Sequence, residues 1–371
     1  MNKECIREIL ATDAPALKRF VTLERRLLSQ YPLYVPNFAS AVSQYLTGKS
    51  AFTREMGISL FIASDGERDV ARCAALINPK YQAAKDEKVG FIGYFAAAEG
   101  CEACVQALFE KAEAWLKEHG ITRIIAPFNG SAFLGYGVRT DAFDEEPVFF
   151  CGWNPAYYAA CFTLAGYRPA YPLLFYTTDF TSEKYRQALE RAQASKAFQV
   201  RPINKKNWRA DLEIFRQLIN EAFVQEWEWY PATSDEFYEH FTQMKPVLDP
   251  RVMLIAEIQG KPAGVAIGYP DWNPLMRRCK GKFGLLQNLQ FLFGSGHYQN
   301  AGHVFAAVRP EYGGMGIGRS LVVLLCHRYE KRGLNKAYGY TINEDNLRSR
   351  KMNEAIGGTA RLLYHVYDKI I

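Results

Sequence analysis

The sequence predicts a mixed α/β protein made of two tandem domains with the same layout. Three observations lead to this prediction. Short apolar runs typical of strands alternate with amphipathic helical segments in both halves of the chain. A polar segment at 181–197 separates the halves, and the same order of elements recurs after it. Such alternation indicates a mixed sheet with helices on its faces, and 371 residues suffice for two cores.

The first half contains five predicted strands and three predicted helices. The helix at 13–30 carries a stripe of large apolar side chains, including Leu17 and Phe20. Gly120 and Gly166 are typical of residues that end a helix, and Asn154 before a proline is typical of an N-cap. The strands are expected at 58–64, 70–77, 89–96, 121–126 and 171–179, and the other helices at 101–119 and 154–165.

The second half repeats this order after the predicted linker helix. We therefore expect one domain at 1–180, a linker helix at 181–197 and a second domain at 198–371. An insertion at about 271–300 interrupts the repeat. Strands are expected at 199–204, 252–258, 262–269, 303–308, 336–342 and 359–369, and helices at 207–224, 234–247, 316–332 and 346–356.

Composition excludes several classes of protein. Hydrophobic residues make up 49% of the chain and aromatic residues 14%, which excludes a disordered protein. The net charge of +6 is spread along the chain, so we expect no nucleic-acid partner. The histidines lack the spacing of metal ligands, and the pair Cys101 and Cys104 is interpreted as small helix residues, so no metal is expected. No apolar run reaches about 20 residues, which favours a cytoplasmic protein without a transmembrane segment.

Residues 308–321 carry the most informative pattern. A predicted strand ends in a glycine-rich turn that opens directly into an apolar-periodic helix. Glycines let a ligand approach the backbone, and the first N–H groups of a helix attract anions. A glycine-rich turn alone is weak evidence. Here an Asn-led short helix, beginning at Asn346 and ending at Gly357, follows about one strand later.

This combination resembles the GNAT N-acetyltransferase superfamily, whose signature covers residues 300–369 well. The resemblance implies that the chain binds acetyl-CoA or a longer acyl-CoA as cosubstrate. Two positions depart from the pattern, since Gly313 replaces the usual Gln or Arg and Asn353 replaces a tyrosine that protonates the leaving thiolate. The implied cosubstrate-binding residues are Val308, Gly313, Gly314, Met315, Gly316, Ile317, Gly318, Arg319 and Asn346.

The first half resembles a degenerate GNAT domain. Residues 97–101 stand where its phosphate loop should lie, but they contain no Gly-x-Gly, and Glu99 would repel a phosphate. We interpret this half as structural or substrate-shaping. The whole chain also resembles a bacterial family of tandem-GNAT proteins similar to N-acyltransferases. That resemblance leaves open a long-chain N-acyltransferase acting on a lipid amine, as in ceramide synthesis.

Three residues are candidates for catalysis once the GNAT resemblance is accepted. Acyl transfer to an amine needs a base for the amine and an acid for the leaving sulfur. Glu344, just past the strand at 336–342, is the first choice for the base, although it is equally interpretable as a solvated carboxylate. His303 begins the central strand, where some GNAT bases lie, and Tyr364, Tyr340 or solvent is a substitute for the missing tyrosine.

A Trp-rich segment and the insertion are candidates for the acceptor side. Glu226, Trp227, Glu228 and Trp229 follow the first helix of the second domain, in a region that covers the acceptor site of GNAT folds. Ordinary packing of that helix against the sheet explains this segment equally well. The insertion at 271–300 has three interpretations: packing on its own domain, contact with a membrane surface, or a dimer face. Its apolar residues are Phe283, Leu285, Leu286, Leu289, Phe291, Leu292 and Phe293.

Taken together, these features predict an N-acyltransferase in which a primary amine attacks the acyl-CoA directly. The expected partners are a small-molecule or lipid amine, with a peripheral membrane contact and a homodimer as further alternatives. A non-catalytic acyl-CoA-binding or scaffold protein is the competing hypothesis, because of Asn353 and the degenerate first half.

Overall fold

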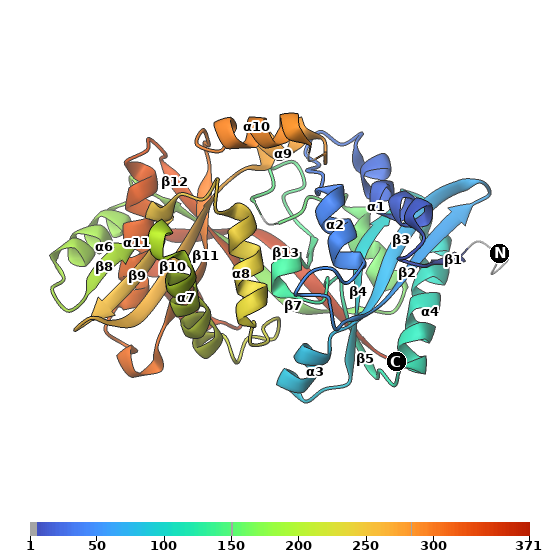
Figure 1. Cartoon of the computed structure of the whole chain (residues 1–371), viewed down its shortest axis with the longest axis horizontal. Helices are drawn as coiled ribbons and strands as arrows, with labels where there is room; N and C mark the ends of the chain where they lie inside the picture. The colour runs from blue at the N-terminus through green and yellow to red at the C-terminus, as the bar shows by residue number, and fades with distance from the viewer. Residues whose placement is uncertain (1–5, 150, 283) are drawn as a thin grey trace. The chain divides into compact units, whose positions relative to one another are not determined.

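The computed structural model describes residues 6–149, 151–282 and 284–371, without the side chains of Asn288, Leu362 and Leu363. Phe283, one of the apolar residues of the insertion, lies outside this range. The chain forms two compact units. Unit 1 comprises 1–172, 273–289 and 363–371, and unit 2 comprises 173–272 and 290–362. Figure 1 labels their elements.

Unit 1 is a mixed sheet with helices packed against it. Its strands follow the order β1-β2-β3-β4-β5-β13, in which only the pair β4 and β5 is parallel. The elements that lie wholly in this unit are β1 (Ile6–Ile9), α1 (Ala14–Leu28), α2 (Ala39–Leu46), β2 (Gly57–Asp65), β3 (Arg68–Ile77), α3 (Pro79–Lys85), β4 (Val89–Ala97), α4 (Glu102–Glu118), β5 (Arg123–Ala126), η2 (Ala132–Leu134), β6 (Val138–Arg139), α5 (Tyr157–Leu164) and α9 (Asn273–Cys279).

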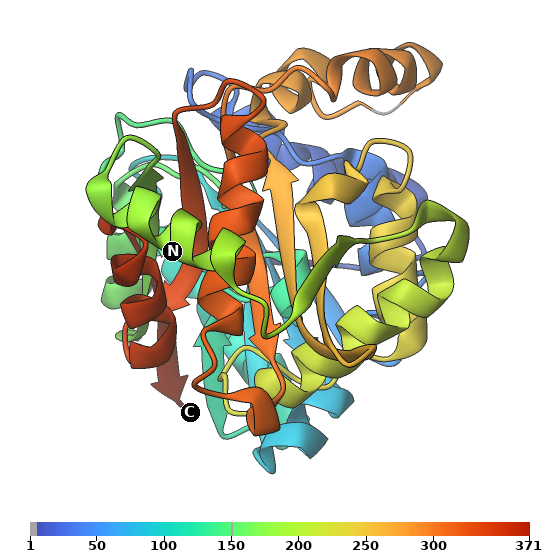
Figure 2. The ribbon, with the colours of Figure 1, turned by 90° about the vertical axis from the view of Figure 1, so that its left-hand side faces the viewer.

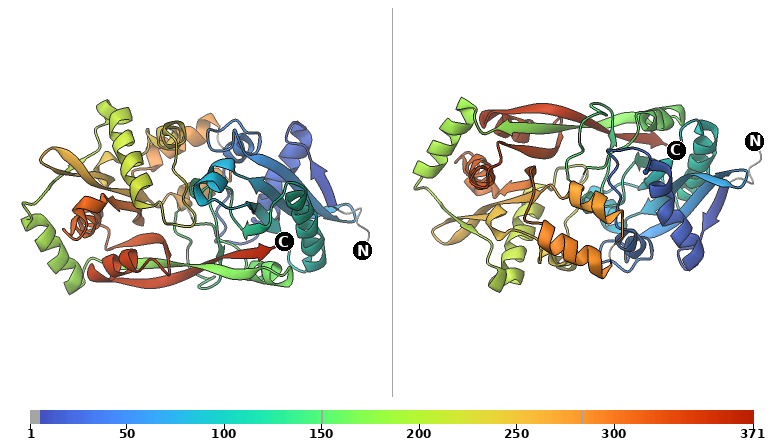
Figure 3. Two further views of the ribbon diagram at one scale, coloured as in Figure 1. Left: turned by 90° about the horizontal axis from the view of Figure 1, so that it is seen from below. Right: turned by 90° about the horizontal axis from the view of Figure 1, so that it is seen from above.

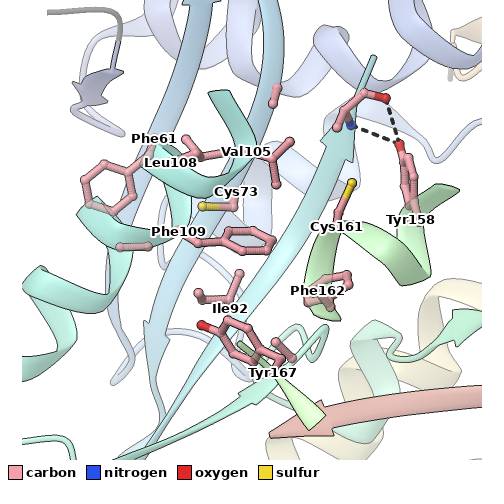
Figure 4. Close-up of a cluster of buried hydrophobic side chains, with 14 of the residues drawn as sticks. Phe61, Cys73, Ile92, Val105, Leu108, Phe109, Tyr158, Cys161, Phe162 and Tyr167 are labelled. Atoms are coloured by element: carbon pink, nitrogen blue, oxygen red, sulfur yellow. Dashed lines mark hydrogen bonds between the residues drawn. The ribbon is translucent and has the colours of Figure 1, made fainter. Parts of the chain in front are cut away.

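The core of unit 1 lies between β2–β4 and the helices α4 and α5 (Figure 4). Phe109 of α4 and Phe162 of α5 are fully buried, with ring centroids 5.2 Å apart. The hydroxyl of Tyr158 lies 3.0 Å from the backbone nitrogen of Ala97 and accepts its hydrogen bond. The apolar faces of α4 and α5 thus anchor both helices to the end of β4, as their periodicity requires.

Unit 2 repeats this pairing pattern. Its strands follow the order β7-β12-β11-β10-β9-β8, and only β11 and β12 are parallel. Helix α11 packs on this sheet together with α6 (Figure 2). The elements are α6 (Glu183–Ala194), β8 (Gln199–Pro202), η3 (Lys205–Asn207), α7 (Trp208–Ala222), α8 (Ser234–Met244), η4 (Pro250–Val252), β9 (Met253–Ile258), β10 (Lys261–Pro270), β11 (Ala301–Val308), η5 (Pro310–Tyr312), α11 (Ile317–Glu330), β12 (Lys336–Asn343) and α12 (Leu347–Ala355).

The last strand of each half completes the sheet of the other half. Strand β7 (Arg168–Asp179) ends the first repeat, yet its residues 173–179 pair with β12 in unit 2. Strand β13 (Gly358–Ile370) ends the second repeat, yet its residues 367–370 pair with β5 in unit 1. Figure 3 shows β7 and β13 side by side. The compact units therefore differ from the predicted boundaries at 180 and 198, because backbone pairing groups strands that are distant in sequence.

The predicted linker helix is present as α6, and one of its faces packs into the core of unit 2. Tyr185, Ala188, Leu189 and Ala192 are buried in the core of unit 2, on one face of the helix. The hydroxyl of Tyr185 also donates to Glu330 of α11, with the oxygens 3.0 Å apart. The high polar content of this segment reflects its exposed face only.

The predicted N-cap role of Asn154 is wrong. Helix α5 begins at Tyr157, after Ala156. The side chain of Asn154 instead accepts from the backbone nitrogen of Arg139 at 2.7 Å and donates to the Arg139 carbonyl at 3.2 Å. This pairing with β6 satisfies a buried amide more fully than one capping bond would.

The insertion at 271–300 divides between the two units. Its first helix, α9, belongs to unit 1, where Asn273 donates to the Pro147 carbonyl at 2.8 Å. The following loop is held by Arg25, which donates to the Lys280 carbonyl at 2.8 Å, and by Ala39, whose N–H donates to the Gly281 carbonyl. The unit boundary then falls within α10 (Leu285–Gly294).

Candidate active site

Strands β11 and β12 diverge in the middle of the unit 2 sheet. They pair in parallel only at Gly302 with Tyr338 and at His303 with Gly339. β11 nevertheless continues to Val308 and β12 to Asn343. A register irregularity between Gly339 and Ile342, with Thr341 at a φ of 37°, bends β12 where the pairing ends. The facing backbone edges beyond this point are not bonded to each other, so an extended ligand can hydrogen-bond to them.

The glycine-rich turn after β11 presents a row of backbone donors. Gly314 and Gly316 have φ values of 82° and 76°, which glycine adopts without strain. In the parts of the chain that the structure describes, no group accepts a hydrogen bond from the N–H groups of residues 314–319. These donors lie at the N-terminus of α11, where the helix dipole favours an anion.

Two arginines lie beside this turn. A Cβ placed on Gly316 would lie 3.6 Å from a guanidinium nitrogen of Arg319, and one placed on Gly313 would lie 4.0 Å from a guanidinium nitrogen of Arg348. The turn therefore combines main-chain donors with positive charge, as a pyrophosphate requires. Gly313 differs from the prediction in one respect, because its N–H donates to the Pro310 carbonyl at 2.9 Å.

A cluster of two carboxylates and two amides lies at the end of β12. Nδ2 of Asn343 lies 2.8 Å from Oε2 of Glu226 and 3.1 Å from Oε2 of Glu228. Nδ2 of Asn346 lies 2.6 Å from Oε1 of Glu226, while its Oδ1 caps α12 by accepting from the N–H of Ser349 at 2.9 Å. The loop after α7 is thereby joined to both the end of β12 and the start of α12.

Trp227 completes the cluster. Its indole Nε1 donates to Oδ1 of Asn343 at 2.8 Å, so the Asn343 amide uses its donor and its acceptor atoms together. Sequence reasoning missed Asn343 as a site residue. The available signal was its position as the last residue of a strand that runs directly into Glu344 and Asn346.

Comparison with known proteins identifies the fold around this site. The acetyltransferase (GNAT) family model matches residues 212–357, which include the diverging strands, the turn and the cluster. Residues 212–357 form a GNAT acetyltransferase domain. The GNAT fold implies an acyl-CoA cosubstrate, and the open strand edges and free N–H row fit the arm and the pyrophosphate of such a molecule.

Two curated relatives resemble the chain over almost its whole length. One is named bacterial ceramide synthase, from Caulobacter vibrioides, and is 27% identical over 98% of this chain and 97% of its own. The other is Protein YghO of Escherichia coli, which is 26% identical over 96% of this chain and 93% of its own. The chain is an acyltransferase that is similar to these two relatives along almost its whole length.

Solved structures show the same fold. A tandem GNAT protein from the clavulanic acid biosynthesis pathway covers 98% of each chain, with a TM-score of 0.57 and 14% identity. A GCN5-related N-acetyltransferase from Sphaerobacter thermophilus covers 98% of this chain and 95% of its own, with a TM-score of 0.52 and 14% identity. The first of these likenesses supports a fold of two GNAT-like halves.

In the N-terminal GNAT-like half, residues 128 and 129 fill the space where β4 and β5 diverge, which corresponds to the divergence of β11 and β12. Its parallel strands β4 and β5 pair only at residues 89–91 with 123–125. Beyond that point Phe128 donates its N–H to the Ile92 carbonyl at 3.0 Å, and Oδ1 of Asn129 accepts from the N–H of Tyr94 at 2.7 Å. A Cβ on Gly93 would lie 2.7 Å from the Phe128 carbonyl oxygen. These contacts occupy the edge that β11 leaves open in the GNAT domain, in keeping with a degenerate first half.

Trp229 is buried in the GNAT domain. Only 2% of it is exposed, and its ring lies 5.8 Å from that of Phe305 of β11. Its indole Nε1 donates to Oδ1 of Asn220 at 3.2 Å. Trp229 therefore fixes the loop that carries Glu226 and Glu228 against the sheet.

His303 is the last residue of β11 that pairs with β12, and it is 5% exposed. A Cβ on Gly339 would lie 3.1 Å from Nε2 of His303 and 2.7 Å from Oδ1 of Asn353, so the two side chains meet at this glycine. Burial lowers the pKa of His303 to about 4, and Asn353 opposes part of that shift. The imidazole is neutral at pH 7.

Glu344 and Tyr364 are not among the residues whose side chains form the hydrogen bonds of the cluster described above. Glu344 is exposed, and its backbone carbonyl accepts from Arg350 at 3.0 Å. Tyr364 belongs to unit 1, where it is 2% exposed and its hydroxyl donates to the Gly152 carbonyl at 3.3 Å. Burial raises the pKa of this phenol. Both catalytic roles stay predictions.

Among residues 6–149, 151–282 and 284–371, no group of three or more His, Cys, Asp or Glu side chains is arranged to hold a metal ion. In the same ranges, no helix combines the length and apolar character needed to cross a bilayer.

Proposed function

We propose that the GNAT domain transfers an acyl group from acyl-CoA to a primary amine by direct attack. The observation that carries this proposal is the row of unbonded N–H groups at 314–319, next to the divergence of β11 and β12. The row supports binding of the CoA pyrophosphate, and the open edge of β11 supports binding of the pantetheine arm. Val308 ends that edge.

The proposed reaction has one bond-forming and one bond-breaking event. The amine nitrogen attacks the thioester carbon, a C–N bond forms, the C–S bond breaks and CoA leaves as a thiolate. A base takes one proton from the amine nitrogen, and the thiolate gains a proton. A main-chain N–H on the open edge of β11 is suited to stabilise the developing oxyanion.

We assign the base to Glu228 in preference to Glu344. Glu228 is 6% exposed and shares the Asn343 amide with Glu226, whereas Glu344 is exposed. Both oxygens of Glu226 accept from amide nitrogens, so this carboxylate is suited to holding the loop and the ammonium form of the acceptor. No tyrosine occupies position 353, and the proton for the thiolate comes from solvent in this proposal.

The relative named bacterial ceramide synthase favours a long acyl chain and a lipid amine over acetyl transfer to a small amine. It aligns with 98% of this chain. Acetyl-CoA with a small amine is the alternative acyl donor and acceptor pair.

The test measures binding and turnover separately. Thermal shifts with CoA, acetyl-CoA and palmitoyl-CoA report binding, because a ligand of the folded state raises its stability. Release of free thiol in the presence of a long-chain primary amine or a short polar amine reports turnover. We expect all three CoA compounds to stabilise the protein, with faster turnover of palmitoyl-CoA and the long-chain amine. Binding without turnover of any amine would favour the scaffold alternative, which Asn353 motivates. Absence of any shift would exclude the proposed CoA site.

A further inference from the structure

Helix α10, labelled in Figure 1, carries five exposed apolar side chains on one face. Leu285, Leu289 and Leu292 recur at helical spacing, and Leu286 and Phe293 lie beside them on the same side. Leu285 is 81% exposed and Phe293 76%, and the other three side chains are between 45% and 62% exposed. Isolated exposed apolar residues are ordinary, but five on one face of one helix indicate an interaction surface.

The opposite side of α10 is fixed to the protein. Phe291 is 8% exposed and packs edge-on against Trp272, with ring centroids 5.8 Å apart. The indole Nε1 of Trp272 donates to the Ser295 carbonyl at 3.2 Å, one residue beyond the helix end. The apolar face therefore points outward because Phe291, on the other side, is the anchor.

The segment before α10 carries exposed positive charge. Arg278, Lys280 and Lys282 are exposed, and the sequence from 272 to 300 contains no Asp or Glu. The backbone at Lys280 and Gly281 is anchored by Arg25 and Ala39, so these basic side chains are held at the start of the helix.

We propose that α10 is an interfacial anchor that docks the protein onto an anionic phospholipid bilayer. An apolar helix face flanked by Lys and Arg combines burial in the acyl boundary with attraction to lipid phosphates. A second copy of this chain fits less well, because pairing two such segments brings like charges together. The inference does not depend on acyl transfer, since α10 contains none of the residues placed in the active site.

The test uses co-sedimentation of the full chain with vesicles. Wild type is mixed with phosphatidylcholine vesicles and with vesicles that contain phosphatidylglycerol, at low and high salt. We expect sedimentation with the anionic vesicles that weakens at high salt. The variant Lys280→Gln/Lys282→Gln should lose about 25-fold in partition coefficient, at about fivefold for each charge. The variant Leu285→Gln/Phe293→Gln should lose at least about tenfold.

A matched control separates docking from general surface effects. Leu10→Gln/Leu164→Gln removes two apolar side chains that are 68% and 65% exposed in unit 1, and it should sediment like wild type. Thiol release from a soluble acyl-CoA and amine pair should be unchanged in all variants. Equal sedimentation with both vesicle types, or none with either, would overturn the proposal. A fall from dimer mass to monomer mass in Leu285→Gln/Phe293→Gln would instead assign the face to a second copy.

Discussion

The side-chain nitrogen of Asn346 lies 2.6 Å from Oε1 of Glu226, which joins the cap of α12 to the loop after α7. Asn346 thus has two roles. Its Nδ2 bonds to a residue 120 positions earlier in the sequence, and its Oδ1 caps α12 by accepting from the N–H of Ser349. The side chain of the residue predicted to hold the CoA arm is therefore bonded to Glu226 and to the N–H of Ser349.

Asn346→Ala should lower the free energy of unfolding by about 1–3 kcal/mol, because both a cap and a bond to a carboxylate are lost. In a double-mutant cycle with Glu226→Gln, measured by urea unfolding, we expect a coupling of at least about 0.5 kcal/mol. The control cycle combines Glu226→Gln with Asp13→Ala, which removes the cap of α1. In that cycle the two changes in unfolding free energy should simply add. Additivity in both cycles would show that the Asn346–Glu226 bond contributes nothing.

Glu228→Gln should lower kcat by about 100-fold, the lower range for loss of a general base. Glu344→Gln should change kcat by less than about twofold, because that carboxylate is exposed. Steady-state kinetics on both variants, with melting curves to confirm folding, distinguish the two candidates. The reverse ranking would return the base to Glu344.

Gly316→Asp should weaken CoA binding at least about tenfold relative to Gly316→Asn. Asp and Asn have similar size, and both tolerate the left-handed conformation that position 316 requires, so the comparison isolates the charge. Isothermal titration with CoA measures it. Equal affinities would mean that the pyrophosphate does not bind at this helix terminus.

His303 should make the protein less stable in mild acid. Its pKa is about 4 in the folded state and about 6.5 when unfolded, so the unfolded chain binds more protons between these values. Stability is therefore fully present above pH 6.5 and is lost as pH falls toward 4. Between pH 7 and 5 the loss attributable to His303 is about 2 kcal/mol.

Urea unfolding of wild type and His303→Gln at both pH values checks this prediction. The variant cannot be protonated, so its pH dependence should be smaller by that amount. A difference below about 0.5 kcal/mol would indicate that the imidazole is not shielded from water.

One acyl-CoA should bind per chain. Asn129 and Phe128 occupy the strand edge of unit 1 that corresponds to the open edge of β11. Titration of the full chain should give a stoichiometry near one, and Gly316→Asp should weaken this one site without revealing a second site. Two sites per chain would contradict the account of the first half.

Local patterns were enough to predict most elements and the glycine-rich turn before α11. Helical periodicity marked α1 and α11, and Gly316 marked the start of α11, because these signals depend on neighbours in sequence. Asn154 was misassigned as a cap, because its partner Arg139 lies in another strand and local sequence cannot show that bond. The free N–H row was foreseeable, whereas the use of the Gly313 N–H by Pro310 was not.

The sequence by itself determined the two-fold repeat of elements, the glycine turn and the apolar character of the insertion. Tertiary structure decided which strand completes which sheet, how Asn343 gathers Glu226 and Glu228, and which side of α10 faces outward. The reason is the sequence distance over which each effect acts, because backbone propensity and periodicity depend on only a few neighbouring residues. Strand pairing, side-chain hydrogen bonds and burial depend on groups that only folding brings together.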